Sequence, residues 1–282
     1  ACLAAAGRVR LTLCARSPFD ELVVESAGGT FRARPRVLTS PDELGDTRVT
    51  WALLATKAHQ TEEAAPWLRA LAARGASFAV AQNGVEHEAR VRPHVGAAAT
   101  VLPIVVACPV DRLGPGWARR RGDVRLTVPA GASGRAFRAL FEGADAHVEC
   151  SDDFVTAAWA KLCLNVVAAV AALSGSPMGV VRRPDVAALA RGLVAEAVRV
   201  GRAEGARLDE GLADTIVDAV VRGSPDARPS LVQDVLARRP LEYDARNGAV
   251  VRAGARRGVP TPLNAAVTAL LAALSAGFER GG

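Results

Sequence analysis

Only two lysines, Lys57 and Lys161, occur among the 35 basic residues of this 282-residue chain, and the other basic residues are arginines. The guanidinium group of arginine is planar and stays protonated, whereas lysine carries a compact ammonium group whose pKa changes on burial. A chain with this bias would keep lysine where a guanidinium cannot do the same chemistry. We therefore expect both lysines to mark functional positions. The alternative is that they are two ordinary surface residues.

Lys161 stands in a setting that suits proton transfer to a carbonyl oxygen. It precedes Asn165 by four residues in an apolar sequence, so the two polar side chains share one face of a predicted helix. An amine and an amide on such a helix cost free energy unless they face a cleft or find partners. An ammonium in a cleft stabilises a developing negative charge and then donates its proton. A lysine that reaches out to solvent is the alternative interpretation.

Polar residues follow three predicted strands. Arg16, Lys57 and Asn83 stand just after the strands expected at 8–14, 49–55 and 77–81. Ligands of open parallel sheets bind at the carboxyl ends of the strands, where an arginine suits the 2′-phosphate of NADP. No acidic residue occupies 15–17 to accept from the 2′-hydroxyl of NAD. Asn83 offers a donor and an acceptor to a nicotinamide amide or a substrate, although an ordinary Asn-Gly turn explains it equally well.

The first half of the chain alternates strand and helix patterns. Further strands are expected at 100–107 and 124–128, with helices at 61–73, capped by Thr61, and at 84–92, ended by Pro93. This alternation predicts an α/β domain with a doubly wound parallel sheet at 1–150. The remainder shows no strand pattern and predicts an all-helical domain at 151–282. Its helices are expected at 152–173, 184–205, 209–222, 230–238, 242–257 and 262–276.

One element of a dinucleotide-binding fold is missing from the sequence. No G-x-G-x-x-G occurs, and residues 1–6 read as the tail of a helix that Gly7 ends. We therefore expect the α/β domain to be N-terminally incomplete here. Its first strand and its glycine-rich turn would lie in a short segment upstream of residue 1.

The bulk composition narrows the classes of partner. The net charge is +6, but the arginines are scattered, and seven Phe, four Trp and one Tyr are too few for a base-stacking surface, so we expect no nucleic-acid partner. Five cysteines without a CxxC, and four histidines without ligand spacing, favour a cytoplasmic protein without a metal. The longest apolar run, 162–173, is too short to cross a bilayer, and no membrane partner is expected.

Several short motifs, taken together in their order, resemble those of the ketopantoate reductase (2-dehydropantoate 2-reductase) family. They extend along essentially the whole chain, and five in register are specific where single ones are weak. The motifs are LATKAHQ at 54–60, QNG at 82–84, WAKLCLN at 159–165, SLVQD at 230–234 and EYD at 242–244 followed by Asn247-Gly248.

This resemblance implies NADPH-dependent reduction of 2-dehydropantoate to the 2-hydroxy acid, a step of pantothenate biosynthesis. It also implies a Rossmann-like NADP-binding domain, a helical substrate domain, and an active site in the cleft between them. Lys161 would be the general acid, with Glu242 as a catalytic partner that keeps it charged or accepts from a substrate hydroxyl. The substrate would contact Asn83, Asn165 and Ser230. The cofactor would contact Arg16, Lys57, Gln60 and Asn83.

One departure from the family pattern concerns the substrate. Ala169 stands where the family usually has a second asparagine, so the substrate is either 2-dehydropantoate or a closely related small 2-oxo acid. Two alternatives stay open: another β-hydroxyacid-type NADP dehydrogenase, which the Glu242 segment argues against, and a non-catalytic dinucleotide-binding protein. The sequence does not decide the oligomeric state, and a homodimer stays open.

Overall fold

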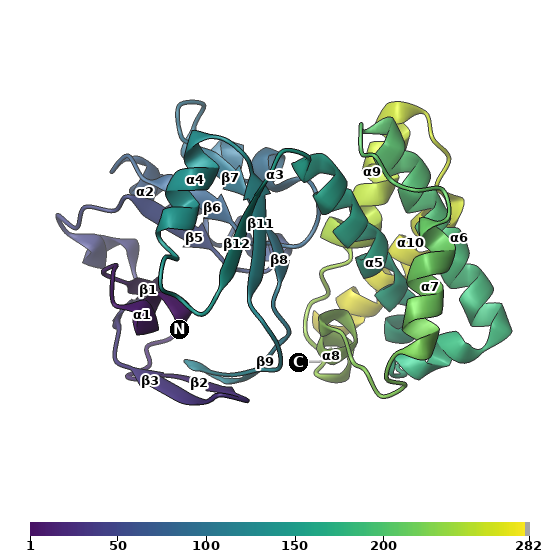
Figure 1. Cartoon of the computed structure of the whole chain (residues 1–282), viewed down its shortest axis with the longest axis horizontal. Coiled ribbons are helices and arrows are strands. Elements are labelled where there is room, and N and C mark those ends of the chain that lie inside the picture. The colour runs from purple at the N-terminus through teal and green to yellow at the C-terminus, as the bar shows by residue number, and fades with distance from the viewer. Residues whose placement is uncertain (280–282) are drawn as a thin grey trace. The chain divides into compact units, whose positions relative to one another are not determined.

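The computed structural model describes residues 1–279, in which the chain forms two compact units. The first unit holds most of the chain up to Phe154. The second holds the chain from Val155 onward together with two short segments of the first half, Lys57–His59 and Asn83–Glu86. Figure 1 labels most of the strands and α-helices of both units. The two segments therefore bring residues from strand ends into the helical unit.

Parallel strands form the centre of the first unit. β5 (Trp51–Leu54), β6 (Ser77–Val80) and β7 (Val101–Pro103) pair side by side in that order, with Leu54 opposite Val80 and Val80 opposite Pro103. β1 (Thr12–Cys14) and β4 (Arg36–Leu38) form a separate two-stranded parallel sheet. Phe78, Ala79 and Val80 are fully buried, as expected for a central strand covered on both faces.

Two further sheets complete the first unit. One has the order β12 (His147–Ser151), β11 (Arg125–Pro129), β8 (Val105–Ala107), with β11 parallel to β12 and antiparallel to β8. The other has the order β3 (Gly29–Ala33), β2 (Leu22–Ser26), β10 (Trp117–Arg120), β9 (Val110–Gly114). The helical segments of this unit are α1 (Cys2–Ala6), η1 (Pro41–Leu44), α2 (Ala65–Ala72), α3 (His87–Val95) and α4 (Ala132–Ala139). The short η2 (Ala58–Gln60) has its first two residues in the second unit and Gln60 in the first.

Three sequence-based expectations for the first unit are corrected. α2 begins at Ala65 rather than near Thr61, because Pro66 favours the first turn of a helix, and the buried Thr61 hydroxyl instead accepts from the Gln82 amide at 3.1 Å. α3 continues through Pro93, whose ring is exposed while Val91 and Val95 stay buried. The strand expected at 100–107 is split at residue 104 into β7 and β8, which belong to different sheets.

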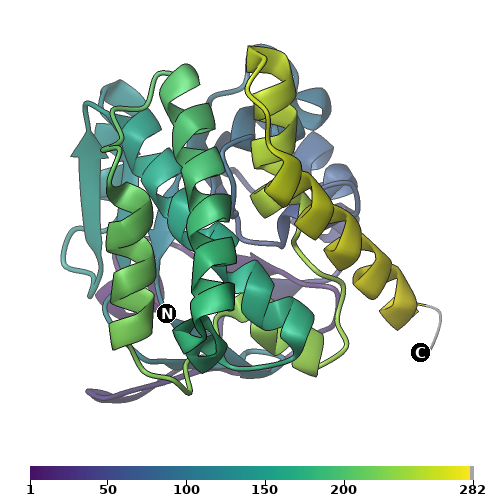
Figure 2. The ribbon, with the colours of Figure 1, turned by 90° about the vertical axis from the view of Figure 1, so that its right-hand side faces the viewer.

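The second unit is helical in its described residues from 155 to 279. It consists of α5 (Phe154–Ser174), η3 (Met178–Arg182), α6 (Pro184–Ala203), α7 (Leu212–Arg222), α8 (Ser230–Leu236), the π-turn η4 (Asp244–Gly248), α9 (Ala249–Arg257) and α10 (Pro262–Glu279). α6 and α7 lie side by side in both views (Figure 2). The predicted fold class, an α/β part followed by a helical part, is confirmed.

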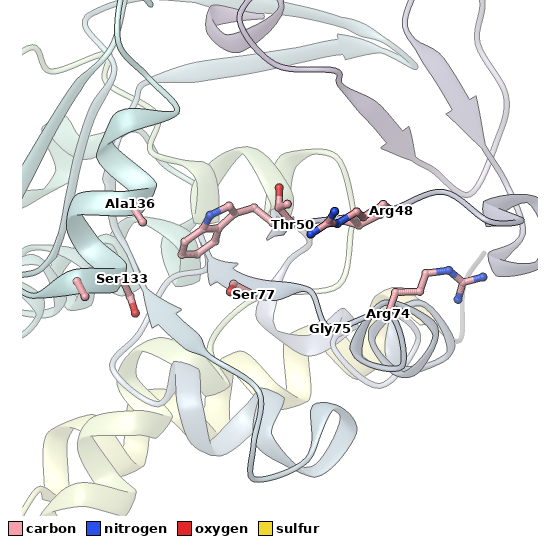
Figure 3. A pocket seen from close by; sticks show the side chains of 10 residues that line it. Arg48, Thr50, Arg74, Gly75, Ser77, Ser133 and Ala136 are labelled. Atoms are coloured by element: carbon pink, nitrogen blue, oxygen red, sulfur yellow. The ribbon is translucent and has the colours of Figure 1, made fainter.

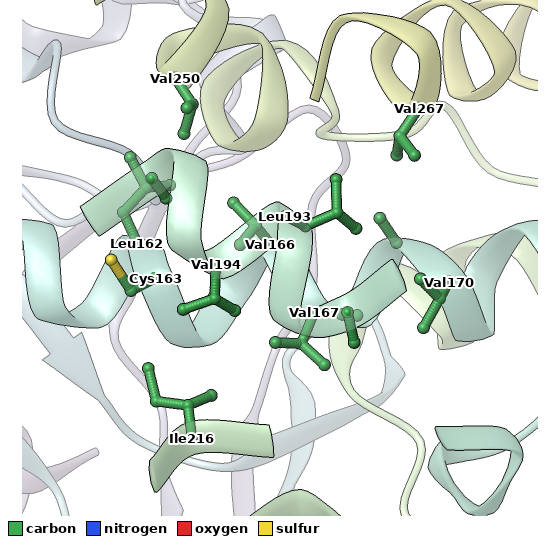
Figure 4. Close-up of a cluster of buried hydrophobic side chains, with 14 of the residues drawn as sticks. Leu162, Cys163, Val166, Val167, Val170, Leu193, Val194, Ile216, Val250 and Val267 are labelled. Atoms are coloured by element: carbon green, nitrogen blue, oxygen red, sulfur yellow. The ribbon is translucent and has the colours of Figure 1, made fainter. Parts of the chain in front are cut away.

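α5 forms the core of the helical unit. Its side chains Leu162, Val166 and Val167 pack among apolar residues of α6, α7, α9 and α10 (Figure 4). By length and composition α5 is apolar enough to cross a membrane, but 56% of the stretch concerned is buried inside the unit. The core of a helical domain explains that composition.

The helix expected at 242–257 is wrong in its first part. Residues 244–248 form a π-turn in which Gly248 N–H donates to Tyr243 C=O at 3.0 Å, and the α-helix begins only at Ala249. π-turns are rare in proteins, and those that occur are often found at functional sites. Glu242 precedes this π-turn, and Arg246 lies within it.

Candidate active site

Glu242 is a buried carboxylate fixed by two segments that follow strands of the first half. The residue is 2% exposed. Its Oε1 accepts from the Ala58 backbone N–H at 2.9 Å, and its Oε2 accepts from the Asn83 side-chain amide at 2.7 Å. The Arg246 guanidinium, four residues further on, lies 3.6 Å from Oε2. These three partners occupy both carboxylate oxygens.

The surroundings of Glu242 keep it ionised. Burial alone would raise the pKa of its carboxyl, since it disfavours the charged form. The charges of Arg246 and Lys57 and the hydrogen bonds from Ala58 and Asn83 outweigh burial, so the pKa lies below its ordinary value. Glu242 is therefore a fixed negative charge at neutral pH.

Asn83 is placed by a tight turn against the π-turn. Gly84 has a φ of +103°, and a Cβ built on it would lie 2.5 Å from the Ala245 carbonyl oxygen. Only glycine fits such a conformation and such a close approach. The Asn83 side-chain oxygen also accepts from the Asn165 amide at 3.3 Å. The side chains of Asn165, Asn83 and Glu242 thus form a chain of hydrogen bonds.

Lys161 lies one turn before Asn165 on α5 and is half-buried. Within residues 1–279 its ammonium makes no hydrogen bond and no ion pair. Burial lowers the pKa of Lys161, and the positive charge of Arg246 lowers it further. An amine that is partly desolvated and not neutralised by a carboxylate is ready to bind and protonate an oxygen.

The expected pairing of Glu242 with Lys161 does not occur within the described chain. The charge partner of Glu242 is Arg246, at its i+4 position in the π-turn, together with the more distant Lys57. The sequence-based interpretation overlooked Arg246. Its spacing of four residues from a carboxylate was the available signal, because residues at that spacing lie on one face of a helix. No sequence pattern marks a π-turn.

Arg246 also connects Glu242 to Ser230. The Arg246 Nη2 atom donates to the Ser230 hydroxyl at 2.8 Å. Ser230 is the first residue of α8, whose N-cap residue is Pro229. The residue is exposed. Its hydroxyl therefore faces the Arg246 guanidinium rather than the backbone of its own helix.

Lys57 is held by an ion pair in the helical unit. Its ammonium lies 2.8 Å from Asp234 Oδ2, and the Asp234 side chain is 5% exposed and also accepts from Arg239. A cofactor phosphate or ribose at Lys57 would share the ammonium with Asp234. Lysine can serve both partners, because it carries three N–H donors.

Arg16 and Gln60 lie in the first unit. Arg16 follows β1, which is not in the same sheet as β5 and β6, so only Lys57 and Asn83 follow neighbouring paired strands. The Arg16 side chain is 75% exposed and has a loose contact of 3.6 Å with Glu63. Gln60 ends η2 and is half-buried. The exposed guanidinium at the end of β1 suits an anionic cofactor group such as a 2′-phosphate.

Two other features bear on the chemistry. No cluster of three or more His, Cys, Asp or Glu that would hold a metal occurs in the described part of the chain.

A hollow of about 470 Å³ at the amino ends of β5 and β6 is lined by Trp51, Arg48, Arg74 and the start of α4 (Figure 3). It lies at the strand ends opposite to those that carry Lys57 and Asn83. Parallel sheets bind ligands at the carboxyl ends.

Ala169, on the same helix as Lys161, is fully buried in the core of the helical unit. It stands two turns after Lys161 and makes no polar contact through its methyl group. The position therefore contributes packing rather than a hydrogen bond.

Family models match both halves of the chain. The model described as "Ketopantoate reductase PanE/ApbA" matches residues 1–133, and the model described as "Ketopantoate reductase PanE/ApbA C terminal" matches residues 153–275. Both matched ranges contain residues of the candidate site, including Asn83 in the first and Lys161 in the second.

Similar proteins carry the corresponding name. A 2-dehydropantoate 2-reductase of Caulobacter vibrioides is 43% identical over 263 residues, covering 93% of this chain and 89% of that protein. One of Mycobacterium tuberculosis is 44% identical over 241 residues, covering 86% and 81%. A crystal structure of a PanE/ApbA family ketopantoate reductase from Ralstonia eutropha superposes with a TM-score of 0.85 at 28% identity, covering 99% of this chain and 94% of that one.

Proposed function

The chain belongs to the ketopantoate reductase family, and on that premise we propose that it reduces 2-dehydropantoate, or a closely related small 2-oxo acid, to the 2-hydroxy acid with NADPH. The reaction makes it an NADP-dependent oxidoreductase that acts on a CH–OH group. With 2-dehydropantoate as the substrate, the product is pantoate, an intermediate of pantothenate biosynthesis.

Lys161 is the proposed general acid. When the ketone carbon is reduced, negative charge develops on its oxygen, and the Lys161 ammonium stabilises that charge and then donates its proton to it. The unpaired, half-buried state of this ammonium is the observation that carries the proposal. A lysine already neutralised by a carboxylate would be a weaker acid and would have to break an ion pair first.

Glu242 acts mainly by holding other groups. Its carboxylate fixes the Asn83 amide and the Ala58 backbone, and it faces Arg246. Asn83 and Asn165 then present the rest of their polar atoms to the substrate. Such a network orients a substrate because each member is held by another. A direct proton transfer from Glu242 is unnecessary in this scheme.

The described residues fit a nicotinamide dinucleotide phosphate. NADPH, when bound, supplies the two electrons and the hydrogen that reach the ketone carbon. Arg16 would hold the 2′-phosphate, and Lys57, Gln60 and Asn83 would hold other parts of the cofactor. An exposed arginine that lacks a tight ion pair is available for a phosphate at low cost, since no strong contact must be broken first.

The oxo acid is the expected small-molecule partner, and we place the reaction in the cytoplasm. The five cysteines are free, in agreement with a reducing compartment. The apolar core position of Ala169 leaves the substrate without one amide that the family pattern offers. For that reason a 2-oxo acid with a bulkier or more apolar chain is a second candidate substrate. A homodimer is a proposal for the assembly.

The test is the oxidation of NADPH by the purified protein with 2-dehydropantoate and a panel of other 2-oxo acids and 3-hydroxy acids. We expect turnover with 2-oxo acids, a preference for NADPH over NADH, and no turnover with 3-hydroxy acids and NADP. Binding of NADPH without turnover of any acid would favour a dinucleotide-binding protein instead. Oxidation of 3-hydroxy acids would favour the β-hydroxyacid dehydrogenases.

A further inference from the structure

Arg246 carries a guanidinium that is nearly sealed from solvent and poorly satisfied. Its side chain is 3% exposed. Nη2 donates to the Ser230 hydroxyl and faces Glu242, whereas Nε is buried without a hydrogen-bond partner in the described chain. Nη1 donates no hydrogen bond within residues 1–279 either. Most of the five N–H donors of this guanidinium therefore have no acceptor in the protein.

Such an arrangement costs folding free energy, because a buried charge with unsatisfied donors has lost its hydration without full replacement. A buried unsatisfied group in a native protein calls for an explanation, such as a catalytic role or a bound water, ion or ligand that completes it. The donors of Arg246 are those that match the oxygens of a carboxylate, in number and in planarity.

The charges around Arg246 favour an anion. Glu242 faces Arg246, but its oxygens already accept from Ala58 and Asn83. Lys161, which carries a second positive charge, is close enough for Arg246 to lower its pKa and has no carboxylate partner in the described residues. Of these two cations only Arg246 faces a carboxylate, Glu242, at 3.6 Å. A bound carboxylate would remove this excess of positive charge.

Ser230 completes the donor set. Its oxygen accepts from Arg246, so the hydrogen of its own hydroxyl is left to donate elsewhere. The residue is exposed at the start of α8, where a small molecule can reach it. The Ser230 hydroxyl and the Arg246 guanidinium are therefore adjacent donors held together by a hydrogen bond.

We propose that Arg246 binds the carboxylate of the 2-oxo acid together with Ser230 and thereby selects acids over neutral analogues. The inference rests on the proposed function, because it names the part of the substrate that this side of the site recognises. The carboxylate keeps its charge throughout the reduction, so Arg246 contributes binding that is equal in the ground state and the transition state. Its removal should raise KM and leave kcat much less affected.

The experiment compares 2-dehydropantoate with its neutral carboxamide in the wild type and in Arg246→Met. Truncation of one member of a buried charge pair lowers affinity by roughly 30- to 5,000-fold. We expect kcat/KM for the acid to fall by that factor, through KM, and kcat/KM for the carboxamide to change by less than about threefold. Arg256→Met, on an exposed arginine of α9, is the control and should leave both values unchanged.

Two further variants and a binding measurement cover the case in which Arg246→Met does not fold. Arg246→Lys keeps the charge and should retain part of the preference for the acid, whereas Arg246→Gln should lose it. Calorimetric binding of pantoate, the product acid, should weaken in the same order without any turnover.

An equal loss on acid and carboxamide, or no loss on the acid, would overturn the role of Arg246. Failure of the wild type to reduce any 2-oxo acid would overturn the proposed function instead. The two results are therefore distinguishable.

Discussion

Asn83 donates its side-chain amide to the Glu242 carboxylate over 2.7 Å, which joins two residues that are 159 positions apart in the chain. The contact requires the turn after β6 to approach the π-turn closely, and Gly84 makes that approach possible. The position of the Asn83 side chain therefore depends on the backbone at Gly84, where there is no room for a Cβ. A small change at Gly84 should therefore disturb the polar groups of the site.

Gly84→Ala should destabilise the protein and impair turnover. The new Cβ would meet the Ala245 carbonyl, and a residue other than glycine is strained at this φ, which costs about 1–3 kcal/mol. The turn must move, so Asn83 loses its bond to Glu242 and kcat falls. Urea unfolding and steady-state kinetics measure the two effects.

Gly96→Ala is the matched control for this variant. Gly96 also has a positive φ, of +78°, but open space around its Cβ position. It should show the backbone strain without the clash and without loss of activity. Equal destabilisation of the two variants, with unchanged turnover in both, would contradict the positioning role of Gly84.

The sequence predicts the relative positions of site residues when they lie on the same helix or strand. Lys161 and Asn165 share a helix, so their spacing places them on one face, and the strand–helix alternation predicts the α/β part. The contacts between segments are different, because Glu242 meets Ala58 and Asn83 across long stretches of chain. Neither spacing nor periodicity encodes such a contact. Only the family resemblance placed Glu242 and Asn83 in one site, and it did not include Ala58 among the site residues.

Other differences have local causes. The sequence-based expectations omit the β2–β3 hairpin, although two residues, Ala27 and Gly28, connect the paired ends of its strands as in a tight hairpin turn. They also omit β9 and β10, because the arginines in this segment conceal the antiparallel pairing of the two strands. The π-turn at 244–248 has no recognised sequence signal, so the pattern predicted an α-helix through these residues.

Lys161→Met should abolish most of the turnover while the fold is kept. Methionine has a similar apolar stem but no proton to donate, and loss of a general acid lowers the rate by about 10²–10⁴-fold. Lys161→Arg should be nearly as slow, because a guanidinium holds its proton too tightly. NADPH oxidation gives the rates, and thermal unfolding checks the fold. A rate within about threefold of the wild type would remove Lys161 from the mechanism.

The pH dependence of kcat should report the protonation of Lys161. The amine must carry its proton to act as an acid, so kcat falls as the pH rises through its pKa, which burial and the charge of Arg246 hold below the ordinary value. Arg246→Gln removes that neighbouring charge, so the pKa of Lys161 rises and the falling limb moves to higher pH. Arg256→Gln is the control. An unshifted limb in Arg246→Gln would show that another group titrates.

Arg16→Asp should exchange the cofactor preference. The exposed guanidinium after β1 is lost, and the new carboxylate repels a 2′-phosphate but accepts from a 2′-hydroxyl, so KM rises for NADPH and falls for NADH. Loss of a charged hydrogen bond to a phosphate costs about 1.5–3 kcal/mol, and the ratio of kcat/KM for the two cofactors should shift by roughly tenfold or more. Arg34→Asp, at another exposed arginine of the first unit, keeps the net charge of the variant and should leave the ratio unchanged. A parallel shift in both variants would mean that the overall charge, rather than the position after β1, sets the preference.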